Sequence, residues 1–194
     1  FKNGATECVA LFSCKGLCVV EVKTGKKVAF ANWETQYDVN AADPVPLNGK
    51  IFISSGYGRG CALVDISGAN PKTVWEHKAM RNHFSSCVLI KGHLYGIDGN
   101  AGNGSLKCLD FASGKEIWSQ NLGFGGLMAA GENLIVLNES GNVFIVKSSS
   151  AGFEEISSAT GILGKTCWTA PVLCRGTIFC RNSKGDIVAI DVSK

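Results

Sequence analysis

Residues 103–118 have the sequence Asn-Gly-Ser-Leu-Lys-Cys-Leu-Asp-Phe-Ala-Ser-Gly-Lys-Glu-Ile-Trp, and this stretch decides the fold. It contains a short apolar segment, the polar group Ser113-Gly114-Lys115, and a second short segment that ends at Trp118. Two short segments joined by a glycine-containing turn are typical of antiparallel strands. We therefore expect a strand, a tight turn and a second strand here.

The same pattern recurs along the chain. Residues equivalent to Asp110 stand at Glu21, Asp65, Lys147 and Asp191, so that the spacings are 44, 45, 37 and 44 residues. A period of about 40–45 residues with about four strands per repeat is typical of a β-propeller. The sequence thus predicts an all-β fold, a β-propeller of four-stranded antiparallel blades, with about 4.5 blades present.

The predicted blades divide the chain into five parts. They span approximately residues 1–36, 37–79, 80–121, 122–160 and 161–194. Large side chains at the end of the fourth strand are expected to wedge each blade against the next; they are Phe30, Trp75, Trp118 and Ile156. Asp65, Asp110, Gly114 and Asp191 are expected to set the turns of the repeat. We interpret the chain as half of a larger ring, whose other half or a second copy covers the apolar end faces.

Composition excludes several classes of protein. The net charge of +3 and the scattered basic residues argue against a nucleic-acid partner. No apolar stretch approaches the ~20 residues of a membrane span. The nine cysteines include no Cys-x2-Cys pair, which argues against zinc. We expect most of the cysteines to be small buried apolar residues, while one or two disulfides remain possible.

The loops of the predicted propeller fall on two faces. If the strands of a blade are named A to D from the axis outward, the A–B and C–D turns share one face. The B–C turns and D–A connections share the other, and these are longer, more polar and richer in aromatic residues. Function commonly resides on such loops. The candidate ligand-binding residues on this face are Asp43, Tyr57, Arg59, Asn82, His83, Asp98, Asn100, Trp168 and Arg181.

Three motifs contain residue types that could bind a ligand or act in catalysis. Gly56–Gly60 looks nucleotide-like, but no helix follows to bind a phosphate, although Arg59 offers donors for an anionic group. Asp98–Gly104 resembles a calcium loop, but its spacing does not match, so a long hairpin loop is the better interpretation. His83 is a candidate base or metal ligand, and a structural role in its loop is the simpler alternative. No catalytic residue and no metal ligand is predicted.

The stretch Asn103–Trp118 resembles the repeat of the PQQ-like (pyrroloquinoline-quinone-type) propellers, whose core is Leu-Asp-x-x-Ser/Thr-Gly-Lys-x-x-Trp. Further stretches look like planctomycete and verrucomicrobial proteins with this repeat; they are residues 37–43, 55–60, 82–86, 94–100 and 167–172. The resemblance covers essentially the whole chain. It implies an eight-bladed ring, of which this chain would be the C-terminal half, in a protein that is usually exported to the periplasm or cell surface.

Two functional branches share this fold. Quinoprotein dehydrogenases hold the quinone and a calcium ion over the ring axis, whereas the lipoprotein of the outer-membrane β-barrel assembly machinery is a protein-binding scaffold without a cofactor. The dehydrogenases typically carry adjacent cysteines, and this sequence has none. We therefore expect a non-catalytic scaffold for a protein, peptide or glycan, without cofactor. The alternative is a PQQ- and calcium-dependent alcohol or sugar dehydrogenase.

Overall fold

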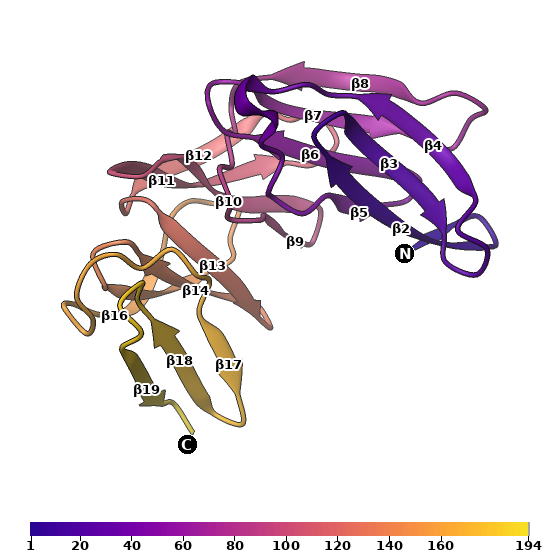
Figure 1. Cartoon of the computed structure of the whole chain (residues 1–194). Helices are drawn as coiled ribbons and strands as arrows, with labels where there is room; N and C mark the ends of the chain where they lie inside the picture. Colours follow the sequence, from indigo (N-terminus) through magenta and orange to yellow (C-terminus); the bar gives the residue numbers. More distant parts are fainter. Residues whose placement is uncertain (194) are drawn as a thin grey trace.

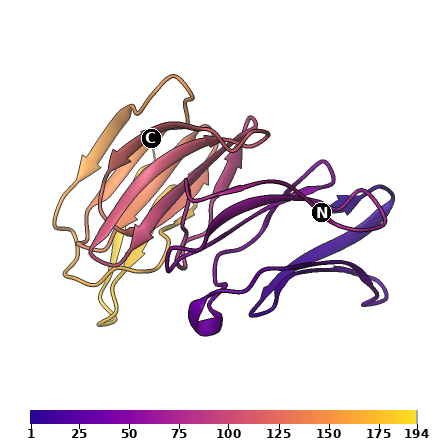
Figure 2. The same cartoon turned by 90° about the horizontal axis from the view of Figure 1, so that it is seen from above.

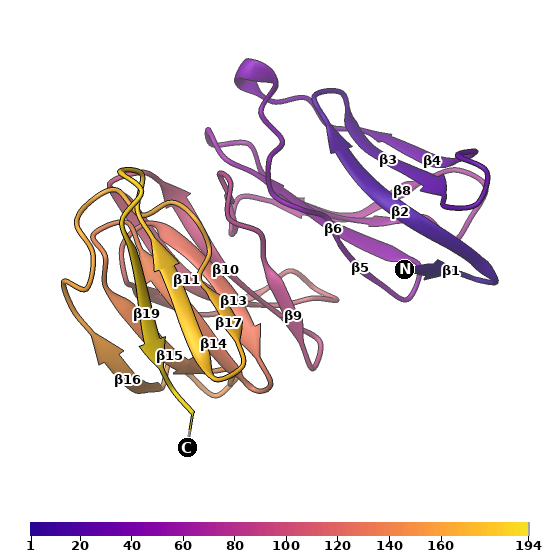
Figure 3. The same cartoon turned by 60° about the horizontal axis from the view of Figure 1, so that its bottom comes forward.

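The computed structural model describes residues 1–193 and consists almost entirely of β-strands. Nineteen strands form five antiparallel sheets, four with four strands and one with three. The sheets follow one another in chain order, and the N-terminal and C-terminal sheets lie at opposite ends of the molecule (Figures 1 and 3). The all-β fold with four-stranded antiparallel blades is therefore confirmed, and we number the sheets blades 1 to 5.

Each blade is a simple meander in which consecutive strands pair. Blade 1 contains β1 (Lys2–Asn3), β2 (Thr6–Ser13), β3 (Gly16–Glu21) and β4 (Lys27–Asn32). Blade 2 contains β5 (Val45–Leu47), β6 (Lys50–Ser55), β7 (Gly60–Asp65) and β8 (Lys72–His77). A short 3-10 helix, η1 (Gln36–Asp38), protrudes from the connection between these two blades (Figure 2).

The remaining three blades repeat this plan. Blade 3 contains β9 (Val88–Ile90), β10 (His93–Asn100), β11 (Asn103–Asp110) and β12 (Glu116–Asn121). Blade 4 contains β13 (Gly125–Ala130), β14 (Asn133–Asn138), β15 (Val143–Lys147) and β16 (Glu155–Ala159). Blade 5 contains β17 (Val172–Cys174), β18 (Thr177–Arg181) and β19 (Ile187–Asp191), and within residues 1–193 it has no fourth strand.

The core consists of four apolar layers, one between each pair of neighbouring blades. Leu17 and Val19 of blade 1, for example, pack with Ile53 and Val64 of blade 2. Burying such a side chain fully stabilises the fold by about 1.5–3 kcal/mol. Because the inner blades are covered on both faces, strand β6 is buried at every position from 51 to 55 rather than at alternate positions.

The predicted wedge residues need a correction. Trp75 and Trp118 lie between blades and donate hydrogen bonds from Nε1 to the oxygens of Ala112 (3.0 Å) and Ser149 (2.7 Å) in the next blade. Phe30 is 40% exposed because it pairs with Cys18 on the outer face of blade 1. The equivalent of Trp118 in blade 1 is Ala29, which pairs with Val19 and is buried.

The same correction applies to blade 4. Ile156 is 53% exposed and lies at a β-bulge, whereas Ser157 pairs with Ile145 at the position of the tryptophan. An error of one residue moves a side chain to the opposite face of a strand. The prediction had matched residue type rather than register.

One further expectation is wrong. Asp98–Gly104 is not a long loop, since β10 extends to Asn100, β11 begins at Asn103, and only two residues form the turn. The cysteines agree with the expectation that most of them are buried: all nine are free thiols in the described chain, six are buried, and Cys14 and Cys174 are exposed.

Candidate functional site

Six aromatic rings form a continuous row across the B–C and D–A face, and we call this row the aromatic band. Its members are Tyr37, Tyr57, His83, Phe84, Phe124 and Trp168. Ring centroids are 5.1 Å apart for Tyr37–Tyr57 and 4.7 Å apart for Tyr57–His83. Phe84 then continues the row, with centroids 5.1 Å from Phe124 and 5.2 Å from Trp168. The band therefore links loops of successive blades.

The ends of the aromatic band are open to solvent, whereas its centre is packed. Tyr37 is 69% exposed and Trp168 is 46% exposed, while Phe124 is fully buried. Trp168 is oriented by a hydrogen bond from its Nε1 to Glu139 Oε2 (3.3 Å), and Glu139 Oε1 also accepts from the backbone N of Gly102 (2.7 Å). The exposed rings are thus held by a rigid base, as interface aromatics commonly are.

His83 lies at the middle of the band. Its Nδ1 is buried and has no hydrogen-bond partner within residues 1–193. Burial lowers the pKa of His83, so that the neutral ring predominates at pH 7. A neutral imidazole among aromatic rings serves as a packing element with one uncommitted nitrogen.

The guanidinium of Arg59 makes contacts within the protein and is not available to bind an anionic ligand through those groups. Its guanidinium lies 3.4 Å from the centroid of the Trp33 ring. Nη1 donates to Glu76 Oε1 (2.6 Å) and Nε donates to the Glu34 carbonyl (3.1 Å). This arginine therefore fastens the loop between blades 1 and 2 to blade 2 through a cation–π contact and an ion pair.

Asp98 is likewise engaged inside the protein. It is 5% exposed, and its Oδ1 and Oδ2 accept from Nε (2.9 Å) and Nη2 (2.7 Å) of Arg81. Lys107 Nζ lies 3.1 Å from Oδ2. Burial alone would raise the pKa of Asp98, but the hydrogen bonds and charges of Arg81 and Lys107 outweigh burial and hold the pKa below its usual value.

The remaining candidates are scattered. Asn82 is fully buried and donates to the Ile97 carbonyl (3.0 Å), which makes it a structural amide. Asp43 accepts a hydrogen bond from Ser86 (3.0 Å). Asn100 is exposed beside a small pocket, and Arg181 lies on the outer face of blade 5.

The structure thus brings only some of the predicted residues together. Tyr57, His83 and Trp168 belong to the aromatic band, whereas Arg59, Asn82 and Asp98 make internal contacts. Sequence reasoning did not select Tyr37, Phe84 and Phe124. Their positions in the sequence could have indicated them. All three lie in connections between blades, and a large aromatic residue is not needed in a solvated loop.

The family model described as outer membrane protein assembly factor BamB matches residues 4–120 and 102–194. The chain belongs to this family. No curated protein matches it. The family assignment confirms the predicted PQQ-like repeat, and within residues 1–193 no helix is long and apolar enough to cross a membrane.

Solved structures share the fold of this BamB-family chain at low identity. BamB from Moraxella catarrhalis is 13% identical with a TM-score of 0.56, over 94% of this chain and 69% of that one. The computationally designed Ika8 protein is 11% identical with a TM-score of 0.72, over 97% of this chain and 56% of that one. Quinohemoprotein alcohol dehydrogenase ADHIIG from Pseudomonas putida HK5 is 10% identical with a TM-score of 0.72, over 96% of this chain and 39% of that one. The chain thus spans about half of Ika8 and less of the dehydrogenase, and these likenesses show the fold alone.

The residues of this BamB-family chain do not fit a calcium–quinone site. Calcium needs six to eight oxygen ligands. Both oxygens of Asp98 are already held by cations, and Asp43 is bound to Ser86. Within residues 1–193 no three His, Cys, Asp or Glu side chains converge on one point.

Proposed function

We propose that this chain is part of an exported, non-catalytic binding propeller that presents the aromatic band to a protein or peptide partner. The observation that carries the proposal is the continuous row of rings from Tyr37 to Trp168, exposed at both ends and fixed at its centre. Rigid aromatic side chains dominate the energetics of protein interfaces because they bury a large area at small entropic cost. Membership in a family named for outer-membrane protein assembly supports a protein partner over a glycan.

The partner surface that suits the band is an apolar, extended segment. The apolar side chains on one face of an extended strand recur every ~6.5–7 Å. A row of rings with neighbouring centroids about 5 Å apart would offer such a strand, for example one from an outer-membrane β-barrel protein, apolar contacts along its whole length. Such segments are exposed only before the barrel folds, which would give the scaffold a role in their assembly.

The test measures binding of fluorescently labelled peptides with the sequences of outer-membrane β-strands, by fluorescence anisotropy. We expect the double variant Tyr57→Ala/Trp168→Ala to lose roughly tenfold or more in affinity, since single interface aromatics often contribute over 1 kcal/mol. Ile117→Ala removes an exposed apolar side chain from β12, outside the band, and serves as the control. Equal affinity of the double variant and the control would contradict the proposal.

The dehydrogenase alternative has a separate test. Dye-linked turnover of primary alcohols and aldoses is measured with added PQQ and calcium. The proposal predicts no turnover above the protein-free rate. Clear activity that depends on both additions would replace the scaffold by the enzyme.

A further inference from the structure

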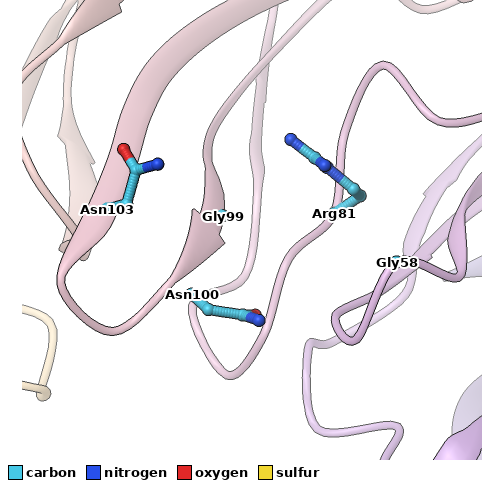
Figure 4. Close-up of a pocket in the computed structure, with 5 residues that line it drawn as sticks. All are labelled: Gly58, Arg81, Gly99, Asn100 and Asn103. Atoms are coloured by element: carbon cyan, nitrogen blue, oxygen red, sulfur yellow. The ribbon is translucent and has the colours of Figure 1, made fainter.

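A polar pocket of about 200 Å³ lies between the B–C turns of blades 2 and 3. It is lined by Gly58, Arg81, Gly99, Asn100 and Asn103 (Figure 4). None of these residues belongs to the aromatic band. The volume suits one small chemical group rather than a drug-sized ligand, whose pockets reach about 300–1,000 Å³.

The base of this pocket is preorganised. Arg81 is held through Nε, Nη2 and its backbone N, which all donate to Asp98 at 2.7–2.9 Å. The backbone N of Gly99 donates to the Arg81 carbonyl (3.2 Å), so the arginine and the end of β10 are tied together. Ligand binding here would cost little conformational entropy of Arg81, because its side chain is already held in place.

The other polar side-chain groups of the pocket are free to bind a ligand. Arg81 Nη1 and the side-chain amides of Asn100 and Asn103 make no hydrogen bond to any residue in the described part of the chain. The backbone at Gly58 leaves open space, since a Cβ there would meet nothing within 4 Å. Polar side chains converging on a concave surface are the usual mark of a ligand site.

The charges decide which ligand the pocket favours. Arg81 and Lys107 are offset by Asp98, which lies between them, and Lys107 is also paired with Glu116 (2.9 Å). The cluster of four groups is therefore neutral and exerts little net attraction on an anion. Carboxamides both donate and accept, so Asn100 and Asn103 match hydroxyl groups, which do the same.

An aromatic ring stands beside this arrangement. Tyr57 precedes Gly58 in the same turn and is exposed. We propose that the pocket binds the hydroxyl groups of a single neutral sugar residue; its lining residues lie outside the aromatic band, and the pocket borders the band at Tyr57. The guanidinium and amide groups would bind the hydroxyls of the sugar, while the turn that carries Tyr57 would form one wall beside the sugar ring.

The experiment is saturation-transfer difference NMR on the full chain, which detects weak ligands of a protein in any oligomeric state. The probes are glucose, galactose, mannose and N-acetylglucosamine, with glucuronate and a glutamate-containing peptide as the anionic arm. We expect a transfer signal from at least one neutral sugar. In Asn100→Ala/Asn103→Ala the affinity should fall roughly tenfold, since each neutral hydrogen bond contributes a few-fold.

The controls separate the site from folding. Neither asparagine side chain has an internal hydrogen bond within residues 1–193, so the melting temperature of the double variant should not change. Asn70→Ala removes an exposed amide from the C–D face and should bind sugar normally. Transfer only from the anionic probes would make this an anion site and overturn the proposal. So would the absence of signal from every neutral sugar, or an unchanged signal in the double variant.

Discussion

Asp98 is a candidate ligand-binding residue in the sequence, whereas in the folded chain it forms internal ion pairs. Its position in an Asp-Gly-Asn stretch resembles a calcium loop. In the folded chain Asp98 is paired with Arg81, 17 residues earlier, and with Lys107, on the paired strand β11. These residues approach only because the connection between blades 2 and 3 folds back over β10, which no local pattern predicts.

Replacing Asp98 by Asn should be costly and should change the response to acid. Breaking a buried ion pair from one side costs about 3–5 kcal/mol, because the partner charges lose their compensation. The pKa of Asp98 is depressed in the fold, so its contribution is present above the unfolded pKa of about 4 and is lost as pH falls through the lower folded value. Asp98→Asn should therefore show less loss of stability on acidification than the unmodified chain.

Urea unfolding at pH 7, 5 and 3 measures this difference. Asp38→Asn is the matched control, because Asp38 is exposed, lies in the left-handed region (φ 56°) and makes no ion pair in the described residues. It should change stability by less than about 0.5 kcal/mol. Parallel acid sensitivity of Asp98→Asn and the unmodified chain would disprove the role of this ion pair.

At the scale of the element, the C–D turn must adopt its own backbone conformation and also pack against the neighbouring blade. In blade 3, Asp110 accepts hydrogen bonds from the backbone and hydroxyl of Ser113 at 2.7 and 2.5 Å, and Gly114 has a positive φ of 73°. The turn then lies against Trp75 of blade 2. One glycine thus satisfies both the turn and the contact between blades.

Two matched substitutions separate these demands. Gly114→Ala places a Cβ 2.3 Å from His77 Nε2 and 2.8 Å from Trp75, whereas Gly25→Ala, with a similar φ of 70°, meets nothing within 4 Å. Gly25→Ala should cost about 1–2 kcal/mol from backbone strain alone. Gly114→Ala should cost about 1–3 kcal/mol more because the blades must separate. Equal shifts in thermal unfolding would show that the contact between blades carries no stability.

The strand register is also an element-scale property. A β-bulge in the C–D pair of each of blades 1 to 4 shifts the fourth strand by one residue. In each blade the residue that directly follows the bulged one lies between the blades, and this residue is Trp75 or Trp118 in blades 2 and 3 but Ala29 in blade 1 and Ser157 in blade 4. Residue type was a poor guide because the bulge inverts which face each following side chain takes.

At the scale of the molecule, both end blades carry an uncovered apolar face. On blade 1, Leu11, Cys18 and Phe30 form a cross-strand row, and Leu11 and Phe30 are exposed. On blade 5, Val172 pairs with exposed Phe179. These faces correspond to the two sides that meet at each internal interface, so we infer that a further propeller segment or a second copy covers them.

The chain should therefore self-associate at micromolar concentration in sedimentation velocity experiments. Leu11→Lys/Phe30→Lys places two charges on the outer face of blade 1 and should shift the chain to monomer, because burying unpaired charges is unfavourable. Val74→Lys changes an exposed residue of β8 away from both end faces and should leave association unchanged. A monomeric unmodified chain would contradict this inference.

The repeat period, the glycine turns and the short apolar runs determined the all-β propeller fold and nearly all strands, because these features depend on local chemistry and on a spacing that recurs. Tertiary structure alone decided which loop residues meet. Tyr57, the pair His83 and Phe84, and Trp168 come from three separate loops, and their contact depends on how successive blades are rotated and stacked. The stretch from Asn103 to Trp118 therefore predicted the blade, whereas the aromatic band and the polar pocket arise from packing between blades.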